Sequence, residues 1–327
     1  MESVTTAPKT KKFISKRRLA YLVKLIIAGA VMIMLLKRVN ITKLLTAFSS
    51  ANIYCISFAL FLLIPNLYLQ FFKWRYLVRL LKPEVSNQET FNSLLAGFTF
   101  GFVTPGRLGE FGRAFFIKDC PWVKVLGMAV MDKFFSLAVV IFWGAIGLMY
   151  FVGRQLYIYT LAPIIIFTMI ALIVIYYILL RPEIIRGFLY SVNIMLPFRD
   201  KIKLLMSSLD NFHRKQALNL LLLSVCFYFI FFFQFYILVC SFQQAPILQS
   251  FLAISSVMIV KSMLPISFGD LGIRESAAIF FLGKIGILEA TAFNASILLF
   301  VINLLIPSII GLVLVLKYRL IFQKNGR

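Results

Sequence analysis

The sequence predicts an all-α integral membrane protein that crosses the bilayer several times. Of its 327 residues, 61% are hydrophobic and only 14% are charged, and the mean hydropathy is +0.93. A soluble domain carries roughly 25% charged residues, so a soluble fold of this length could not bury so much apolar surface. Long apolar runs separated by short basic segments are the third indication, because a helix needs about 20 apolar residues to cross a bilayer.

Six apolar runs have the length of a full transmembrane helix. The first follows a basic tail and ends in Lys37-Arg38-Val39-Asn40 instead of a small-residue cleavage site, so we expect an uncleaved helix and not a signal peptide. We expect one polytopic membrane domain, residues 19–316, between cytoplasmic tails at 1–18 and 317–327. The six runs are 19–36, 53–72, 125–152, 156–180, 217–240 and 290–316.

Two further apolar regions are interrupted and should not cross as straight helices. Phe91 to Val103 is about 13 residues, which makes roughly 20 Å of helix; it runs into Thr104-Pro105-Gly106-Arg107-Leu108-Gly109-Glu110. The region 247–264 runs into a similar stretch from Pro265 to Glu275. Proline removes a backbone donor and glycine frees the backbone, so each region predicts a helix, a break and a second short helix.

The distribution of lysine and arginine predicts the orientation of the spans. Basic residues are scarce around 153–155 and 241–246, whereas the segment 37–43 carries three, which conflicts mildly with the rest. The positive-inside rule places both termini and a linker at about 181–216 in the cytoplasm. That linker could lie on the inner leaflet as an amphipathic helix or pack on the bundle. The basic segments are 1–18, 73–82, 181–215 and 317–327.

When each span is assigned to these sides of the membrane in turn, the two interrupted regions take opposite orientations. The first must enter and leave on the cytoplasmic side and the second on the external side, so we expect two re-entrant broken-helix hairpins. Their breaks also match, since Gly106-Arg107-Leu108-Gly109 resembles Gly269-Asp270-Leu271-Gly272. Together these features predict an inverted repeat, the design of many secondary transporters.

Charged residues at the breaks form the candidate site. A charged side chain near the bilayer centre costs about 2.5–3.5 kcal/mol, so these groups must pair or face a hydrated cavity. Five bases outnumber four acids, which favours an anionic ligand. The alternative is that the prolines and glycines only kink helices and the charges pair structurally. The nine residues are Arg107, Glu110, Arg113, Asp132, Lys133, Lys261, Asp270, Arg274 and Glu275.

We expect the breaks to bind the phosphate of a headgroup near the midplane. Thr104 could cap a helix with Pro105 at its first position, and Ser267 with Asp270 resembles a capping box; both would aim a helix N-terminus at the ligand. Pro105 and Pro265 are the predicted helix breaks. The predicted binding residues are Arg107, Arg113, Arg274, Gly106, Gly109, Gly269 and Gly272, and their predicted charge partners are Glu110, Asp132, Lys133, Asp270 and Glu275.

Other functional classes find little support in the sequence. The net charge of +22 could indicate nucleic acid, but the basic residues lie between membrane spans, so we expect none. The four cysteines have no CxxC spacing and His213 is the one histidine, so we expect neither a metal nor a cofactor. The sequence contains no GxxxxGK[ST] loop, so the chain should not use ATP by the P-loop mechanism.

Both breaks resemble the signatures of a known family. Thr104 to Glu110 with Arg113 is similar to a Pro-Gly-x-x-Gly-Glu-x-x-Arg pattern, and Pro265 to Glu275 to a Pro-x-x-x-Gly-x-x-Gly-x-Arg-Glu pattern. Together they resemble the flippase-like family typified by the transmembrane region of lysylphosphatidylglycerol synthase. The resemblance covers about residues 19–316.

This chain departs from the family pattern at two places. It has Asp132-Lys133 where the family tends to have Glu-Arg, and its last span shows Phe300 or Asn303 where an arginine is frequent. The resemblance implies movement or handling of lipids such as aminoacyl-phospholipids or polyprenyl-linked intermediates. We expect no lysine transfer, because no long polar domain follows Arg327.

Three functions are compatible with these observations. The first is a lipid flippase or scramblase in the cytoplasmic membrane, acting on an anionic phospholipid or polyprenyl-phosphate-linked lipid. The second is a membrane-embedded transferase that uses a lipid-phosphate donor, with Glu110 and Asp132 as candidate acids. The third is a non-transporting subunit of a cell-envelope lipid or polysaccharide synthesis complex. For the flippase we expect no catalytic residue, with membrane lipids as partners and cell-envelope biosynthesis enzymes as further candidates.

Overall fold

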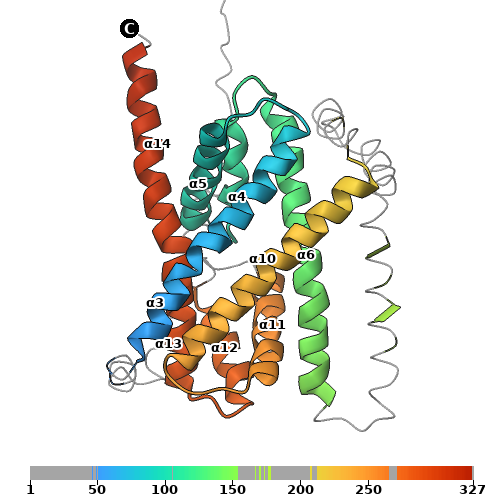
Figure 1. The fold of residues 1–327 in the computed structure, drawn as a ribbon, viewed down its shortest axis with the longest axis vertical. Coiled ribbons are helices and arrows are strands. Elements are labelled where there is room, and N and C mark those ends of the chain that lie inside the picture. The colour runs from blue at the N-terminus through green and yellow to red at the C-terminus, as the bar shows by residue number, and fades with distance from the viewer. Residues whose placement is uncertain are drawn as a thin grey trace, which may run out of the picture.

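The computed structural model describes residues 51–104, 106–153, 212–264 and 271–325, with single positions at 46, 49, 166, 169, 170, 173, 176, 177 and 207. The elements formed within these ranges are all helical (Figure 1). Four helical stretches in them are long and apolar enough to cross a membrane, namely Ile53–Arg79, Trp122–Gly153, Arg214–Cys240 and Glu289–Leu316. The chain is therefore a multi-pass membrane protein.

These four stretches correspond to four of the six predicted runs. The first comprises α3 (Ile53–Phe61) and α4 (Leu63–Arg79), the second is α6 (Trp122–Gly153), and the third is α10 (Arg214–Cys240). The fourth comprises α13 (Glu289–Phe300), a π-helical turn η2 (Val301–Leu305) and α14 (Ile306–Asn325). The runs 19–36 and 156–180 lie outside the ranges described in full, as do the tail 1–18 and most of the linker 181–216, so a count of six remains a prediction.

The helix formed by the predicted apolar run 53–72 extends beyond residue 72. Helix α4 continues to Arg79. The apolar run ends at the first basic residue, Lys73, which begins the basic segment 73–82. Lys73 is buried and paired with a carboxylate on another helix, so the helix has no reason to end there.

The two interrupted regions each form two short helices. The first consists of α5 (Asn87–Val103) and the 3₁₀ helix η1 (Leu108–Phe116), and the second of α11 (Ile247–Met263) and α12 (Ile273–Gly283). The two helices of each region pack on each other. The labelled helix of the first region, α5, lies in the upper half of the molecule, whereas α11 and α12 lie in the lower half (Figure 1).

Helix α5 is longer than predicted because its beginning is capped. It starts at Asn87 instead of near Phe91, and the Ser86 side chain accepts a hydrogen bond from the Glu89 N–H at 3.1 Å. A serine cap satisfies one of the free N–H groups of the first turn, and an acid there complements the helix dipole. The helix therefore begins with the polar residues 87–90, one turn before the apolar run.

The turn after α5 corrects the predicted role of Thr104. This residue ends α5: its hydroxyl donates to the Phe100 carbonyl at 2.9 Å and accepts from the Gly109 N–H at 2.6 Å. Gly106 and Arg107 then adopt left-handed φ angles of 62° and 56°. The next helix begins only at Leu108, because a left-handed pair of residues cannot lie inside a right-handed helix. Pro105 lies outside the described residues.

The second break ends at a glycine as well. Gly272 has φ 89° and precedes the first residue of α12, and its N–H donates to the Glu275 carboxylate at 2.6 Å. A positive φ here requires glycine. The predicted capping pair Ser267 and Asp270, together with Pro265 and Gly269, lies outside the described residues.

Glycines allow η1 to lie against α5. A Cβ atom at Gly101 would come within 2.5 Å of the Glu110 side chain, and one at Gly109 would overlap the Phe100 carbonyl oxygen. Small residues at four-residue spacing, here Gly97 and Gly101, let helices approach closely where no hydrophobic effect drives them together. This contact holds the charged residues of η1 toward the centre of the molecule.

We predict that Gly109→Ala destabilises the protein and that Gly283→Ala does not. The new methyl group at position 109 would collide with backbone, and overpacking of this kind costs about 1–3 kcal/mol. A Cβ at Gly283 meets nothing within 4 Å, so alanine there should be neutral or slightly stabilising. Thermal unfolding in detergent measures both variants, and equal melting temperatures would contradict the proposed close contact.

Candidate functional site

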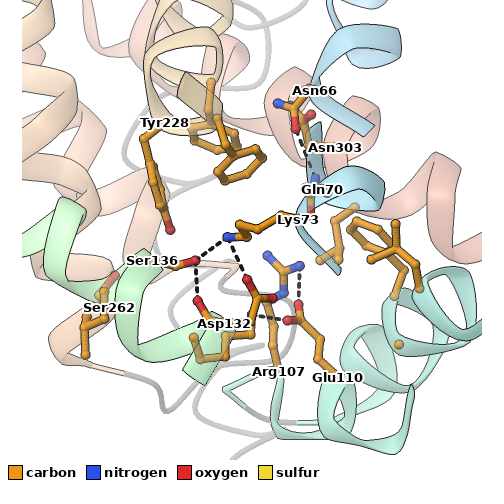
Figure 2. A pocket seen from close by; sticks show the side chains of 18 of the residues that line it. Asn66, Gln70, Lys73, Arg107, Glu110, Asp132, Ser136, Tyr228, Ser262 and Asn303 are labelled. Carbon is orange, nitrogen blue, oxygen red and sulfur yellow. Dashed lines mark hydrogen bonds and ion pairs between the residues drawn. The ribbon is translucent and has the colours of Figure 1, made fainter. Parts of the chain in front are cut away.

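A cavity of about 280 Å³ lies between the described helices. Both interrupted regions line it, together with α4, α6, α10 and the segment from α13 to η2. Figure 2 shows polar and charged side chains gathered around it. Its basic side chains outnumber its acidic ones by six to two: Lys73, Arg107, Arg113, Lys133, Lys261 and Arg274 against Glu110 and Asp132.

Asp132 on α6 is held between two cations from different elements. Lys73 of α4 lies 2.8 Å from one carboxylate oxygen and Arg113 of η1 lies 2.7 Å from the other. All three residues are at most 7% exposed. Lys73 also donates to the Ser136 hydroxyl at 2.7 Å (Figure 2), and the Arg113 guanidinium lies 3.8 Å from the centre of the Trp74 ring. Each charge is thus compensated away from water.

Glu110 forms a second, more open ion cluster. Its carboxylate pairs with Arg107 on the preceding turn and with Lys133 of α6. The side chains of these two cations are 24% and 41% exposed, whereas that of Glu110 is 10% exposed. The two basic groups therefore extend from a buried acid toward the accessible part of the site.

Arg274 belongs to a third cluster at the start of α12. Its Nε donates to the Ser296 hydroxyl at 2.8 Å, and a terminal nitrogen pairs with Glu275. Glu275 is fully buried and also accepts from the Gly272 N–H. The predicted use of this helix N-terminus as an anion site needs correction, because a carboxylate of the protein itself already occupies it.

The structure brings most of the described candidate residues into one place. The cavity is lined by Gly106, Arg107, Glu110, Arg113, Asp132, Lys133 and Arg274. Gly109, Gly272 and Glu275 are not among the lining residues; the first packs on Phe100 and the other two pair with each other. Pro105, Pro265, Gly269 and Asp270 lie outside the described residues.

Helix α4 carries a polar face that was not among the predicted site residues. Asn66, Gln70 and Lys73 all line the cavity, and their spacing of four and three residues puts them on one side of a helix. That spacing was a usable signal, but the apolar residues between them dominate any average over the span. Asn303 was also missed as a site residue, although it is polar in an apolar run.

The donor set indicates what the site can bind. An excess of basic side chains in a largely buried cavity favours an anion, and arginine can bind a phosphate through two parallel hydrogen bonds. In the described part of the chain, no three His, Cys, Asp or Glu side chains form a group that could hold a metal ion. The chemistry of the cavity is therefore that of recognising an anionic group.

We predict that Asp132→Asn destabilises the protein strongly. The amide would leave Lys73 and Arg113 without their counter-charge in a buried site, and breaking a buried pair costs about 3–5 kcal/mol. The matched control is Asp119→Asn, since Asp119 pairs with Lys82 at 3.3 Å but its side chain is 85% exposed. A large drop in melting temperature for the first variant and little change for the second is expected. Similar small effects would show that Asp132 is not essential to packing.

Comparison with known proteins agrees with the resemblance seen in the motifs. The family model for the lysylphosphatidylglycerol synthase TM region matches residues 21–311. No curated protein and no solved structure matches the chain. The match spans nearly all of the predicted membrane domain and both interrupted regions, so the chain belongs to the family of the lysylphosphatidylglycerol synthase TM region.

Proposed function

We propose that the protein translocates a lipid with a phosphate-containing headgroup, such as a phospholipid or a polyprenyl-phosphate-linked lipid. Membership of a family tied to lipid handling supports the general role. The observation that carries the specific proposal is the excess of basic over acidic side chains in a cavity between two interrupted helices.

The charge arrangement suits a phosphate that enters and leaves. Two acids compensate part of the positive charge, which allows the basic side chains to lie together inside the bundle. The remaining positive charge stabilises an incoming anion, and Arg107 and Lys133 are exposed enough to contact it. The volume of about 280 Å³ falls near the lower end for ligand sites, so it fits a headgroup while the acyl chains stay in the bilayer.

We infer that the interrupted helices are re-entrant from opposite sides of the membrane. Helices α5 and α11 have 17 residues each, roughly 26 Å of helix, which is less than the ~30 Å hydrocarbon core. Their positions in opposite halves of the molecule support this inference (Figure 1). Non-helical backbone is tolerated at membrane depth when it lines a cavity, and Gly106 and Arg107 do so.

We further propose that the end containing the 80–86 turn faces the cytoplasm. The end of α4 and the beginning of α10 lie at this end (Figure 1) and carry Arg79, Lys82, Arg214 and Lys215. At the opposite end, the loops 241–246 and 284–288 contain one basic residue, Lys284. This asymmetry favours the cytoplasmic membrane with both termini inside.

The transferase alternative receives less support from the geometry. A general base must be able to take up a proton, but Asp132 and Glu110 each accept ion pairs from two cations. Each carboxylate therefore already serves as the counter-charge of two basic side chains, which indicates a structural role. Association with a cell-envelope synthesis complex stays a prediction.

Translocation of fluorescent phospholipids and polyprenyl-phosphate probes in proteoliposomes tests the proposal. We expect protein-dependent translocation that falls at least about tenfold in Arg107→Gln, because a charge-assisted hydrogen bond contributes about 1.5–3 kcal/mol. Arg107 is preferred over Arg274, whose loss would leave the buried Glu275 without its cation. Arg214→Gln, at the exposed start of α10, is the matched control and should translocate normally.

Two results would contradict the function. One is the absence of translocation of every probe by a folded protein, which would favour the enzyme or partner hypotheses. The other is equal translocation by the Arg107 and Arg214 variants, which would place the substrate path outside this cavity.

Orientation can be tested separately by cysteine labelling. In a variant lacking the four native cysteines, we expect Gln244→Cys to react with a membrane-impermeant maleimide in intact cells and Asp119→Cys to react only after permeabilisation. Both positions are exposed. The reverse pattern would invert the proposed topology without affecting the site.

A further inference from the structure

A cluster of four amide side chains lies beside the basic part of the cavity. Asn66 and Gln70 come from α4, Gln234 from α10 and Asn303 from the π-helical turn η2. Three of them line the cavity, and Gln234 is fully buried behind them. In Figure 2, Asn66, Gln70 and Asn303 lie together beyond Lys73, on the opposite side of it from Glu110.

One backbone carbonyl sets the direction of every hydrogen bond in this cluster. Gln234 donates its NH₂ group to the Ala59 carbonyl at 2.7 Å, and a carbonyl can only accept. The other end of the Gln234 amide must then be its oxygen, which accepts from Asn303 at 2.8 Å and from Asn66 at 3.4 Å. Asn66 in turn accepts from Gln70 at 3.0 Å.

The consequence is that two amide side chains that line the cavity keep an oxygen as their available hydrogen-bonding group. Asn303 uses its NH₂ group on Gln234, and among the described residues its buried Oδ1 has no donor. Gln70 uses its NH₂ group on Asn66, so its oxygen points away from that contact. A buried acceptor without a donor costs about 1–3 kcal/mol, a cost that a ligand donor would remove.

The backbone at Asn303 supports a ligand role for this residue. Val301–Leu305 is a π-helical turn within an otherwise α-helical span, and such turns occur frequently at functional sites because they reorient a side chain. Asn66 and Lys73 are separated by ~10 Å along α4. The polar face of α4 from Asn66 to Lys73 therefore spans about the length of a headgroup.

We propose that the amide cluster Asn66–Gln70–Gln234–Asn303 is a second subsite, which accepts a hydrogen bond from a hydroxyl group on the headgroup whose phosphate binds the basic residues. This inference rests on the proposed function and names the substrate class for that cavity. The hydroxyl belongs to a polyol or sugar attached to the phosphate. An ammonium group is also a donor, but six basic side chains against two acidic ones repel it.

Equilibrium binding to the purified protein in detergent tests the subsite without requiring transport. The probes are three short-chain lipids with identical acyl chains: phosphatidylglycerol, phosphatidylmethanol and phosphatidylethanolamine. The first two carry the same charge, and only the first has headgroup hydroxyls. One neutral hydrogen bond contributes about 0.5–1.5 kcal/mol, so we expect phosphatidylglycerol to bind roughly two- to tenfold more tightly than phosphatidylmethanol. Phosphatidylethanolamine should bind more weakly than phosphatidylglycerol.

Two variants and a control test whether the amide cluster causes the preference for phosphatidylglycerol. Asn303→Leu and Gln70→Leu each remove an acceptor. The ratio of phosphatidylglycerol affinity to phosphatidylmethanol affinity should therefore fall toward one, while phosphatidylmethanol affinity itself changes little. Asn219→Leu makes the same change at an exposed position of α10, where Asn219 donates to the Tyr76 hydroxyl at 3.2 Å, and should keep the preference. Thermal unfolding identifies any variant that fails to fold, and the second amide variant then provides the test.

Each outcome has a separate meaning. Equal binding of phosphatidylglycerol and phosphatidylmethanol, or a preference that persists in both amide variants, would overturn the subsite while leaving the phosphate site in place. Tighter binding of phosphatidylethanolamine would overturn the choice of a hydroxyl. If no lipid binds, both the subsite and the proposed cavity function fail. A preference that disappears in the variants without any translocation would support the subsite and reject transport.

Discussion

Compensation of buried charge is the constraint on which this structure depends. Asp132, Glu110 and Glu275 are acids within a membrane bundle, and each is paired with basic groups. The pairs around Asp132 join three separate elements, since Lys73 comes from α4, Arg113 from η1 and the acid from α6. An ion pair of this kind is costly to break on one side only, so it fixes the interrupted helix against two long helices.

The three ion clusters differ in how deeply they are buried. This difference separates the clusters that hold the helices in place from the one that can contact a ligand. The Asp132 and Glu275 clusters are almost fully buried, and their acids hold cations or backbone in place. The Glu110 cluster leaves Arg107 and Lys133 partly exposed. With the acceptor oxygens of the amide cluster at the other side of Lys73, the cavity offers cations to a phosphate and carbonyl oxygens to its substituent.

Much of this arrangement follows from local sequence signals. The apolar runs located the long helices, and proline and glycine located both breaks to within a few residues. The cost of isolated charges in apolar segments identified seven residues that line the cavity.

What failed were inferences that need tertiary context. The sequence suggested that Lys73 faces water, whereas a carboxylate 59 positions away in the chain holds it inside. Thr104 could equally begin or end a helix, and the left-handed turn at Gly106 and Arg107 decided for the end. The direction of the amide hydrogen bonds depends on the Ala59 carbonyl, which no sequence pattern reveals.

A structure of the protein in nanodiscs of an anionic phospholipid, determined by electron cryomicroscopy, would test the central claim most directly. The account predicts density for a phosphate in the cavity, within hydrogen-bonding distance of Arg107 or Lys133, and acyl chains that leave toward the bilayer. Well-resolved lipid headgroups only at the outer surface of the bundle, with acyl chains or no lipid in the cavity, would contradict it.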